Sequence, residues 1–245
     1  MLYNECCFRV FEKIEPKSID LVLVDLPYGQ TDCNWDTSID LERMWESLTL
    51  ICKPCCQYIF FATTKFGNTL INSNPKSFRY DLVWEKTKPV GFLHAKRQPL
   101  RSHEMIYIFR TTGSPVYNPQ KNPGKPYKER TVTKGTCYKY KTYETIKANP
   151  TGEKHPTSVL HYSMRDKRIH ATQKPLDLCE FLVKSYSNEG DVVLDFCMGS
   201  GTTIVACIQN NRSYIGVERD KDIYDLAVER INQTLRSPPR DECED

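Results

Sequence analysis

The residues best suited to ligand chemistry lie together in the stretch Asp25-Leu26-Pro27-Tyr28-Gly29. Asp25 supplies a carboxylate that accepts hydrogen bonds, Pro27 fixes a bend in the backbone, and Tyr28 supplies a flat aromatic ring. An acceptor, a bend and a ring within four residues could bind and orient a ligand. An ordinary turn after a strand has a similar composition, so this stretch alone leaves both interpretations open.

A second stretch of this kind runs from Asp195 to Thr203. Its Gly199-x-Gly201 pair would let a ligand approach the backbone and the N–H groups of a following helix. Glu218, 17 residues beyond Gly201, could accept both hydroxyls of a ribose, as dinucleotides and S-adenosylmethionine require. A dinucleotide fingerprint would need a third glycine where the chain has Ile204, which favours S-adenosylmethionine. A purely structural glycine turn is the alternative.

Both stretches follow short apolar runs, at residues 18–24 and 191–195, that predict buried parallel β-strands. In open α/β sheets, ligands bind beyond the carboxyl ends of such strands. Further strands are predicted at 58–62, 80–86, 103–109 and 214–218, and helices at 7–14, 38–52, 66–71, 202–209 and 220–235. This alternation predicts an α/β fold with a Rossmann-like, doubly wound, mostly parallel sheet, in which strand 103–109 is an antiparallel or edge member.

Positive charge is concentrated in one part of the chain. Residues 111–170 contain 12 Lys and Arg against 4 Asp and Glu, whereas the remainder contains 22 against 27. Tyrosines are interleaved with these lysines and no periodicity is visible, which predicts a basic insert with a nucleic-acid-binding face. The Lys- and Arg-rich stretch 87–102 predicts a mobile loop near a phosphate backbone. A solvated loop without a binding role is the alternative for such charge runs.

Composition argues against several other classes. The 245 residues contain no apolar run near the roughly 20 residues of a membrane span, and the N-terminus has no pattern of a secretion signal. The 11 cysteines are therefore expected to be reduced thiols in a cytoplasmic protein. Cys52-x-x-Cys55 has the spacing of half a zinc site, but no second pair completes it, and no metal site is predicted.

Four motifs and their order resemble one family, the β-class DNA amino-methyltransferases. Asp25 to Tyr28 is similar to its Asp-Pro-Pro-Tyr catalytic motif, and Asp195 to Thr203 resembles its Phe-x-Gly-x-Gly cofactor motif. Thr172 to Pro175 matches a Thr-Gln-Lys-Pro segment, and Trp84 to Lys86 resembles a Trp-x-Lys segment beside the catalytic loop. The catalytic motif comes first and the cofactor motif last, which is the circularly permuted order of this class.

The resemblance implies a role for each matched residue. Asp25 and the carbonyl of Leu26 would accept the two N–H groups of the target amine, in a loop shaped by Pro27, and Tyr28 would stack on a base flipped out of the duplex. Leu26 stands where the family usually has proline, which keeps the carbonyl and loses the preset backbone angle. The implied cofactor-binding residues are Glu5, Thr172, Lys174, Asp195, Phe196, Gly199, Ser200, Gly201, Thr202, Thr203 and Glu218.

The resemblance also implies an activity, the transfer of a methyl group from S-adenosylmethionine to double-stranded DNA. An aspartate at the first motif position goes mostly with adenine N6, so adenine is expected and cytosine N4 is the nearest alternative. RNA or a protein amide as substrate, a non-catalytic DNA-binding protein and a dehydrogenase also stay open. The expected organisation is a catalytic half (1–110), a target-recognition insert (111–169), a cofactor-binding half (170–235) and a tail (236–245). A homodimer is expected by analogy.

Overall fold

The computed structural model describes residues 1–28, 39–127, 149–164 and 173–236. The chain divides into two compact units. The larger unit consists of Met1–Asn118 and Ser158–Asp245, and the smaller unit is Pro119–Thr157. Within the described ranges, no helix has both the length and the apolar character needed to cross a bilayer.

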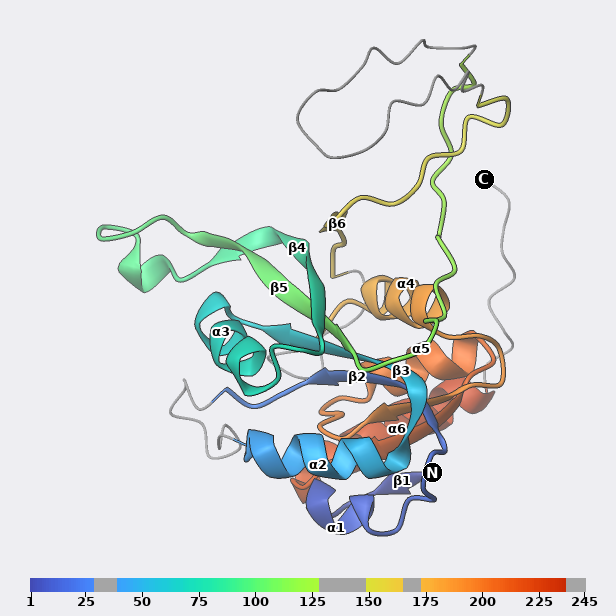
Figure 1. The fold of residues 1–245 in the computed structure, drawn as a ribbon. Helices are drawn as coiled ribbons and strands as arrows, with labels where there is room; N and C mark the ends of the chain where they lie inside the picture. Colours follow the sequence, from blue (N-terminus) through green and yellow to red (C-terminus); the bar gives the residue numbers. More distant parts are fainter. Residues whose placement is uncertain (29–38, 128–148, 165–172, 237–245) are drawn as a thin grey trace. The chain divides into compact units, whose positions relative to one another are not determined.

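The larger unit is built on one eight-stranded sheet (Figure 1). The strand order is β1-β8-β7-β2-β3-β5-β4-β6, and neighbouring strands are parallel except where β5 pairs with β3 and β4. The predicted mostly parallel sheet with an antiparallel member is confirmed. The strands are β1 (Leu2–Tyr3), β2 (Ile19–Asp25), β3 (Cys52–Ala62), β4 (Phe78–Val90), β5 (Arg101–Arg110), β6 (Val159–His161), β7 (Val192–Asp195) and β8 (Ser213–Val217).

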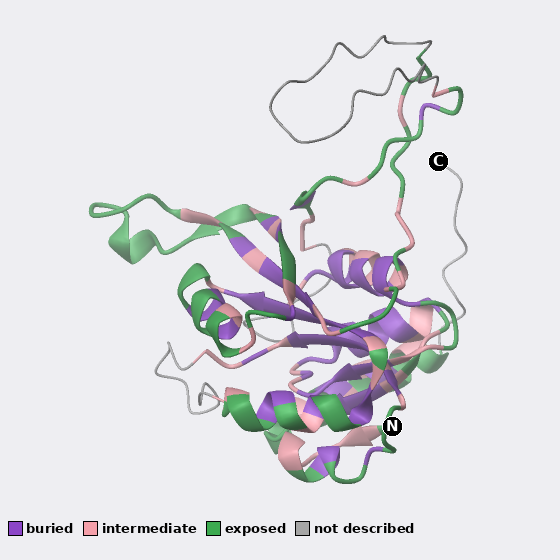
Figure 2. Ribbon diagram, in the orientation of Figure 1, coloured by how far each residue is buried: buried purple, intermediate pink, exposed green. Residues whose placement is uncertain are grey.

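Helices cover both faces of this sheet. One apolar core lies under α1 (Cys7–Phe11), α2 (Leu41–Ile51) and α3 (Thr64–Ser73), and a second lies under α4 (Leu176–Tyr186), α5 (Thr202–Gln209) and α6 (Lys221–Arg236). Along β2, Val22 and Val24 belong to the first core, and Leu21 and Leu23 to the second. Because both faces of the central strands are buried (Figure 2), their sequences are continuous apolar runs.

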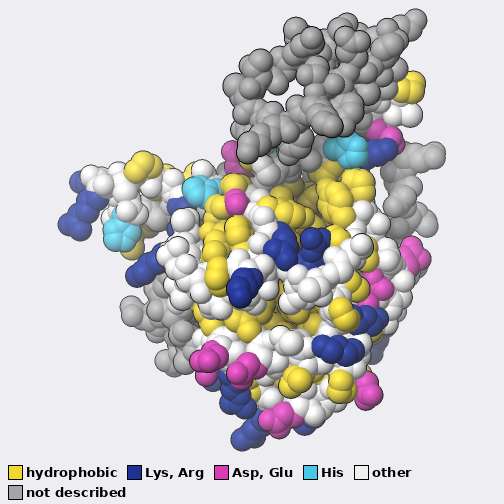
Figure 3. All heavy atoms as spheres, viewed as in Figure 1, with side chains coloured by type: hydrophobic (Ala, Val, Ile, Leu, Met, Phe, Trp, Pro, Cys, Tyr) yellow, Lys and Arg dark blue, Asp and Glu magenta, His cyan; other side chains and the backbone are white. Residues whose placement is uncertain are grey.

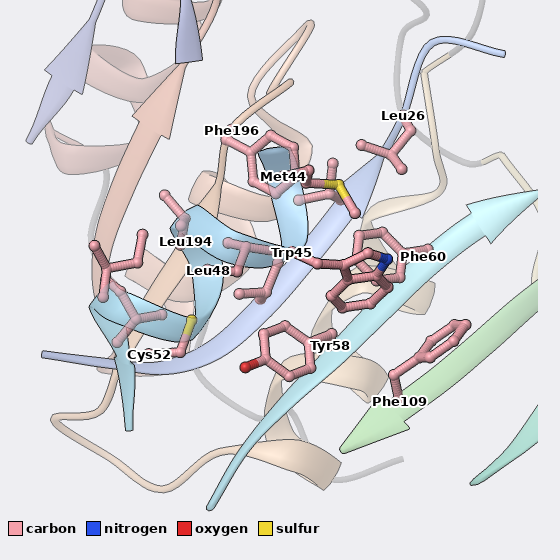
Figure 4. Close-up of a cluster of buried hydrophobic side chains, with 14 of the residues drawn as sticks. Leu26, Met44, Trp45, Leu48, Cys52, Tyr58, Phe60, Phe109, Leu194 and Phe196 are labelled. Carbon is pink, nitrogen blue, oxygen red and sulfur yellow. The ribbon is translucent and has the colours of Figure 1, made fainter. Parts of the chain in front are cut away.

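The first core is organised around Trp45 of α2 (Figure 4). The centroid of its ring lies 5.5 Å from that of Tyr58, 5.6 Å from that of Phe60 and 5.3 Å from that of Phe109. The indole Nε1 donates a hydrogen bond of 2.8 Å to Ser73 Oγ, so its polar atom is satisfied inside the core. Met44 and Leu48 of the same helix also belong to this core.

Helix α3 lies against β5 so closely at Gly67 that a side chain has no room. A Cβ built at Gly67 would be 2.1 Å from Cε2 of Tyr107. We expect Gly67→Ala to lower the free energy of unfolding by about 1–3 kcal/mol, because the ring or the helix must move. Urea unfolding measures the change, and Asn68→Ala, on the exposed side of the same helix, is the control. An unchanged midpoint for Gly67→Ala would contradict this expectation.

The topology opens a crevice between β2 and β7. From β2 the chain passes through α2 to β3, and from the neighbouring β7 it passes through α5 to β8 on the other side. Helices α2 and α5 pack on opposite faces of the sheet. The loops that leave β2 and β7 therefore diverge, and they leave space at the carboxyl edge of the sheet.

The structure corrects the expectations in two places. β6 lies in the interval where no periodicity was visible, because three residues are too few to show one. It pairs in parallel with β4, where Val83 is the partner of Val159. β4 continues to Val90 and β5 begins at Arg101, so the predicted loop 87–102 is wrong at both ends.

The smaller unit lies inside the interval predicted as a recognition insert and is described at 119–127 and 149–157. Isolated antiparallel bridges join Asn122 to Lys154 and Tyr127 to Asn149. Its two segments also meet at Gly152, whose φ is +74° and where a Cβ would lie 2.2 Å from the carbonyl oxygen of Gly124. The tyrosines between 138 and 143 and nearly all of the predicted tail, 237–245, are outside the described residues.

Candidate active site

A cleft of about 670 Å³ lies at the carboxyl edge of the sheet, bordered by the loops that follow β2 and β7. Its size falls in the range of about 300–1,000 Å³ that is usual for ligand sites. Gly201 is the N-terminal cap of α5, next to the cleft, and Thr172 is outside the described residues. The predicted residues that line the cleft are Glu5, Asp25, Leu26, Pro27, Tyr28, Lys174, Asp195, Phe196, Gly199, Ser200, Thr202, Thr203 and Glu218.

Asp25, the last residue of β2, is held on both sides. Its Oδ1 accepts a hydrogen bond of 2.6 Å from the hydroxyl of Tyr28, and its Oδ2 accepts one from the ammonium of Lys174. Burial raises the pKa of Asp25 above its usual value; Lys174 acts in the opposite direction, and the carboxylate of Glu104 adds to the rise. Asp25 is therefore a more basic acceptor than an exposed aspartate. Each of its oxygens already has one hydrogen-bond donor, Tyr28 at Oδ1 and Lys174 at Oδ2.

Leu26 explains how the loop keeps its position without the usual proline. Its side chain is only 2% exposed and belongs to the first core. Tyr28 packs next to it on Phe66, with the ring centroids 5.1 Å apart. Position 26 has no proline ring to preset its backbone angle, and the packing of the Leu26 and Tyr28 side chains holds the loop in place instead.

Glu104 of β5 and Lys86 of β4 extend the contacts of Asp25 into a cluster of four charges. The ammonium of Lys174 lies 3.2 Å from Glu104 Oε1, and the ammonium of Lys86 lies 2.7 Å from Glu104 Oε2. The hydroxyl of Tyr28 is a further 3.4 Å neighbour of Glu104. Two carboxylates and two ammonium groups compensate one another, as a site this buried requires.

The electrostatics of this cluster keep Glu104 and Lys174 ionised. Burial opposes the charge of Glu104, but Lys174 and Lys86 more than offset it and bring its pKa down to about 2. Burial also opposes the charge of Lys174, yet the carboxylates of Asp25 and Glu104 raise its pKa. Its ammonium is further stabilised 4.9 Å above the ring of Phe61. Lys174 is thus a permanent cation shared between two carboxylates.

The sequence did not identify Glu104 as a site residue. It predicted that Lys86 lies beside the catalytic loop, but not that Lys86 pairs with Glu104. Lys86 was expected beside the catalytic loop by its resemblance to the Trp-x-Lys segment and also among the basic residues near a phosphate backbone. The structure pairs it with Glu104, inside the site. A signal for Glu104 was present, because a glutamate next to an apolar strand is seldom buried without a partner.

The loop after β7 is tied to the carboxylate of Glu218. The N–H of Gly199 donates to Glu218 Oε2 at 3.1 Å, and the N–H of Asp220 donates to Oε1 at 2.8 Å. Gly199 and Gly201 have φ angles of +49° and +73°, so both need the conformational freedom of glycine. These bonds fix the carboxylate of Glu218 at the wall of the cleft, where it can accept further donors.

Asp195, at the end of β7, is the second buried carboxyl group of this loop. Burial raises its pKa to about 7, and hydrogen bonds from the Thr203 side chain and the Cys197 N–H limit the rise. The Cys197 N–H lies 3.2 Å from Asp195 Oδ1. Asp195 therefore fixes the start of the loop, and its charge can change near neutral pH.

The N-terminal segment closes another wall of the cleft. Glu5 lines it and forms an ion pair with Lys13. Asn4, which carried no prediction, donates from Nδ2 to the carbonyl oxygen of Glu218 at 2.9 Å. Lys174, predicted at the cofactor, contacts Asp25 and Glu104 in this structure.

The eight cysteines of the described ranges are free thiols. Among the same residues, no group of three or more His, Cys, Asp or Glu side chains is arranged to hold a metal ion.

Substitution of Glu218 should weaken binding of the cofactor more than it weakens the fold. In Glu218→Gln, an NH2 group replaces one carboxylate oxygen, so at that position a donor would face a loop N–H or a ribose hydroxyl. We expect the Kd for S-adenosylmethionine to rise about 10- to 100-fold, the cost of one or two unpaired polar groups. Calorimetric titration measures it, with Glu229→Gln on the surface of α6 as the control. Equal affinity of both variants would contradict this role.

A doubly wound sheet, with Asp25 and the Gly199 loop at the ends of neighbouring strands beside one cleft, defines a Rossmann-like fold. The family model for N6/N4 methyltransferases, described as DNA methylase, matches residues 19–229, and the chain belongs to this family. The Type II methyltransferase M1.MboII of Moraxella bovis is 28% identical over 251 residues, which cover 93% of this chain and 94% of that protein.

Solved structures share the fold at lower identity. The complex of M1.HpyAVI with SAM has a TM-score of 0.63 and 19% identity, and the match covers 95% of this chain and 98% of that one. The PvuII cytosine-N4-specific DNA methyltransferase has a TM-score of 0.67 and 14% identity, with 95% and 90% covered. The predicted fold class and the predicted family are therefore confirmed.

Proposed function

We propose that this chain transfers a methyl group from S-adenosylmethionine to the N6 nitrogen of an adenine flipped out of duplex DNA, at a specific site. Its family supports DNA methylation with S-adenosylmethionine as the cofactor. One observation carries the proposal: Asp25 and the Gly199–Glu218 loop open into a single cleft from the ends of neighbouring parallel strands. Its relatives include Type II methyltransferases, so we also propose a role in restriction–modification.

The residues of the cleft suit this cofactor. S-Adenosylmethionine carries a ribose and a positively charged sulfonium, and it supplies, when bound, a methyl group that is already activated. Carboxyl groups of Glu5, Asp195, Glu218 and Asp220 line the cofactor half of the cleft. Glu218 would hold the ribose hydroxyls, the acidic lining would favour the positive charge, and the apolar side chain of Ile223 would contact the adenine.

Asp25 and Leu26 would prepare the target nitrogen. The lone pair of an aromatic amine is delocalised into its ring, and hydrogen bonds from its two N–H groups to Asp25 and the Leu26 carbonyl would favour a pyramidal, nucleophilic nitrogen. Once it carries the methyl group, the nitrogen would be cationic and would have to lose a proton. Asp25, with its raised pKa, would receive that proton.

Entry of a base requires a change at Tyr28. Its hydroxyl occupies Oδ1 of Asp25, the oxygen that faces away from Lys174. For the base amine to reach Asp25, this hydrogen bond must open, and the tyrosine ring is then free to stack on the base. Extrusion of the base from the duplex costs about a few kcal/mol, which stacking on Tyr28 would partly repay.

The test is transfer of labelled methyl from S-adenosylmethionine to mixed-sequence duplex DNA, followed by digestion to nucleosides. We expect label in N6-methyladenine for the unaltered chain and none for Asp25→Ala. Label in N4-methylcytosine would overturn the assignment of adenine as the target base. Absence of label on duplex DNA, single-stranded DNA and RNA, despite cofactor binding, would overturn the activity in favour of a non-catalytic DNA-binding protein.

Cytosine N4 is the second candidate because the shared fold does not separate the two bases. The PvuII enzyme, named as cytosine-N4-specific, matches this chain as well as M1.HpyAVI does. The preference for adenine rests on the aspartate at position 25, by resemblance. Nucleoside analysis separates the two products directly. We also propose, by analogy with the family, that the chain forms a homodimer, which sedimentation equilibrium would test.

A further inference from the structure

The ends of β4 and β5, with the turn between them, form an arm that leaves the sheet. The arm comprises residues 87–100, and all fourteen are exposed. Figure 1 shows β4 and β5 running out beyond the rest of the sheet, at the left of the view. The arm contains a 3₁₀ turn, η1 (Phe92–His94).

The 3₁₀ turn of the arm is closed by hydrogen bonds and presents apolar side chains. Gly91 has a φ of +88°, and the N–H groups of His94 and Ala95 donate back to Gly91 and Phe92, both at 3.0 Å. This turn presents Phe92, 77% exposed, and Leu93, 82% exposed, which are the two most exposed large apolar side chains of the described residues. Adjacent side chains of this size, held outward by a hydrogen-bonded turn, indicate a contact with another molecule.

The charge of the arm identifies the kind of partner. Lys88, Lys96 and Arg97 lie in it, and residues 86–103 contain no Asp or Glu. Figure 3 shows Lys and Arg side chains gathered at its far end. A second copy of this chain would bring the same positive charge to a symmetric contact between arms, whereas a polyanion would neutralise it. Apolar wedges between basic residues are a known means of unstacking base pairs.

The arm begins next to the catalytic carboxylate. β4 runs parallel to β2, so the arm leaves the same edge of the sheet at which Asp25 lies. At the base of the arm, Lys86 and Glu104 join the charge cluster that holds Asp25 through Lys174. Six residues separate Lys86 from Phe92, a reach of at most about 20 Å at 3.3 Å per residue. This is roughly half a helical turn of B-DNA.

We propose that the arm binds the duplex beside the target base, with its lysines and arginine on the phosphates and Phe92 and Leu93 inserted into the base stack. Insertion there lowers the cost of extruding the target base into the cleft. This inference rests on the proposed function and adds to it the surface that opens the duplex. The partner that binds the arm is double-stranded DNA.

The first test compares the double variant Phe92→Ala/Leu93→Ala with Leu50→Ala/Leu226→Ala, a control that removes two exposed leucines from α2 and α6. The substrates are two duplexes with the site that the unaltered chain methylates, one fully paired and one with the target base opposite an abasic position. On paired DNA we expect the arm variant to lose kcat/KM about 10- to 100-fold, the equivalent of a few kcal/mol of extrusion cost. On the abasic duplex we expect a loss below threefold.

Three outcomes would overturn the inference: an equal loss on both duplexes, no loss on either, or conversion of a dimer to a monomer by the arm variant. If the arm variant methylates both duplexes as fast as the unaltered chain does, the inference about the arm fails but the proposed function stands.

A second test needs no activity. Binding of a random-sequence duplex is followed by fluorescence anisotropy at several salt concentrations. Lys96→Ala/Arg97→Ala should reduce the slope of log Kd against log salt by about 2, one for each phosphate that is no longer neutralised by a side chain. Lys65→Ala/Lys76→Ala, exposed lysines at the two ends of the α3 region, is the control. Equal slopes for the unaltered chain and the arm variant would remove the arm from the DNA interface.

Discussion

Asp25→Asn should reduce kcat for methyl transfer by about 10²- to 10⁴-fold while the Kd for S-adenosylmethionine changes less than threefold. An amide keeps the size of the side chain and one acceptor oxygen, but it cannot accept the proton released by the target nitrogen. The fold should tolerate the change, because Lys174 keeps its contact with Glu104 at 3.2 Å. Single-turnover methylation and cofactor titration measure the two quantities.

The matched control is Asp20→Asn, the same substitution at the other end of the same strand. Asp20 accepts from Lys53 at 2.6 Å and from the N–H of Val192, away from the cleft. It should change thermal stability without a specific loss of kcat. Methyl transfer by Asp25→Asn within threefold of the unaltered chain would show that the carboxylate does not act on the amine.

Glu104→Gln should reduce kcat/KM by about 10-fold or more, although Glu104 does not touch the target base. Glu104 shares Lys174 with Asp25, and without it the ammonium binds Asp25 alone and competes with the base for the carboxylate. Lys86, which is half-buried, also loses its partner at 2.7 Å. Glu104 is thus a positioning residue that acts through Lys174.

The pH profile separates this role from simple loss of structure. Burial, with the charge of Glu104, raises the pKa of Asp25. The role proposed for Asp25 requires its ionised form. Removal of the Glu104 charge lowers that pKa, so the acidic limb of the kcat profile should move to lower pH. Glu85→Gln on the neighbouring strand, where Glu85 pairs with His161 at 2.8 Å on the surface, should leave the limb in place. An unmoved limb in Glu104→Gln would contradict the assigned role.

The stability of the fold should also depend on the charge of Glu104. The pKa of Glu104 falls from 4.5 to about 2 in the folded chain, so its ionised form stabilises the fold. This contribution is complete above about pH 4.5 and is lost as the pH falls through about 2. In Glu104→Gln the pH dependence of the unfolding midpoint between these values should be shallower.

Local patterns were enough to place the loops that carry Asp25, Gly199 and Glu218, because each follows a continuous apolar run at a strand end. The contacts of Glu104 and Lys86 could not be predicted in this way. They depend on the register between β4 and β5, which places Trp84 opposite Glu104 and leaves an irregularity after Glu85. Register between strands is set by packing over the whole sheet, and single-chain periodicity does not contain it.

β6 and the arm illustrate two further limits. β6 has three residues, fewer than any periodic pattern needs, and it is a strand because β4 offers it a parallel edge. The arm has no buried face, so its composition of Gly, Pro, Lys and Arg indicates a loop even where the backbone is extended. In both cases the neighbouring strand supplies the information that the segment lacks.

The charge cluster around Asp25 also constrains when the enzyme can work. Its members come from β2, β4, β5 and the segment before α4, and Asp25 is 149 residues away from Lys174 along the chain. Contacts between residues so far apart in the chain are expected to form late in folding. The entropy lost in closing such a long loop is offset only when the strands of the sheet have paired. A nascent chain on the ribosome has the residues that would hold a base long before it has Lys174 or Glu218. Methylation through this site would therefore require the chain to have been synthesised through Lys174 and Glu218 and the sheet to have assembled.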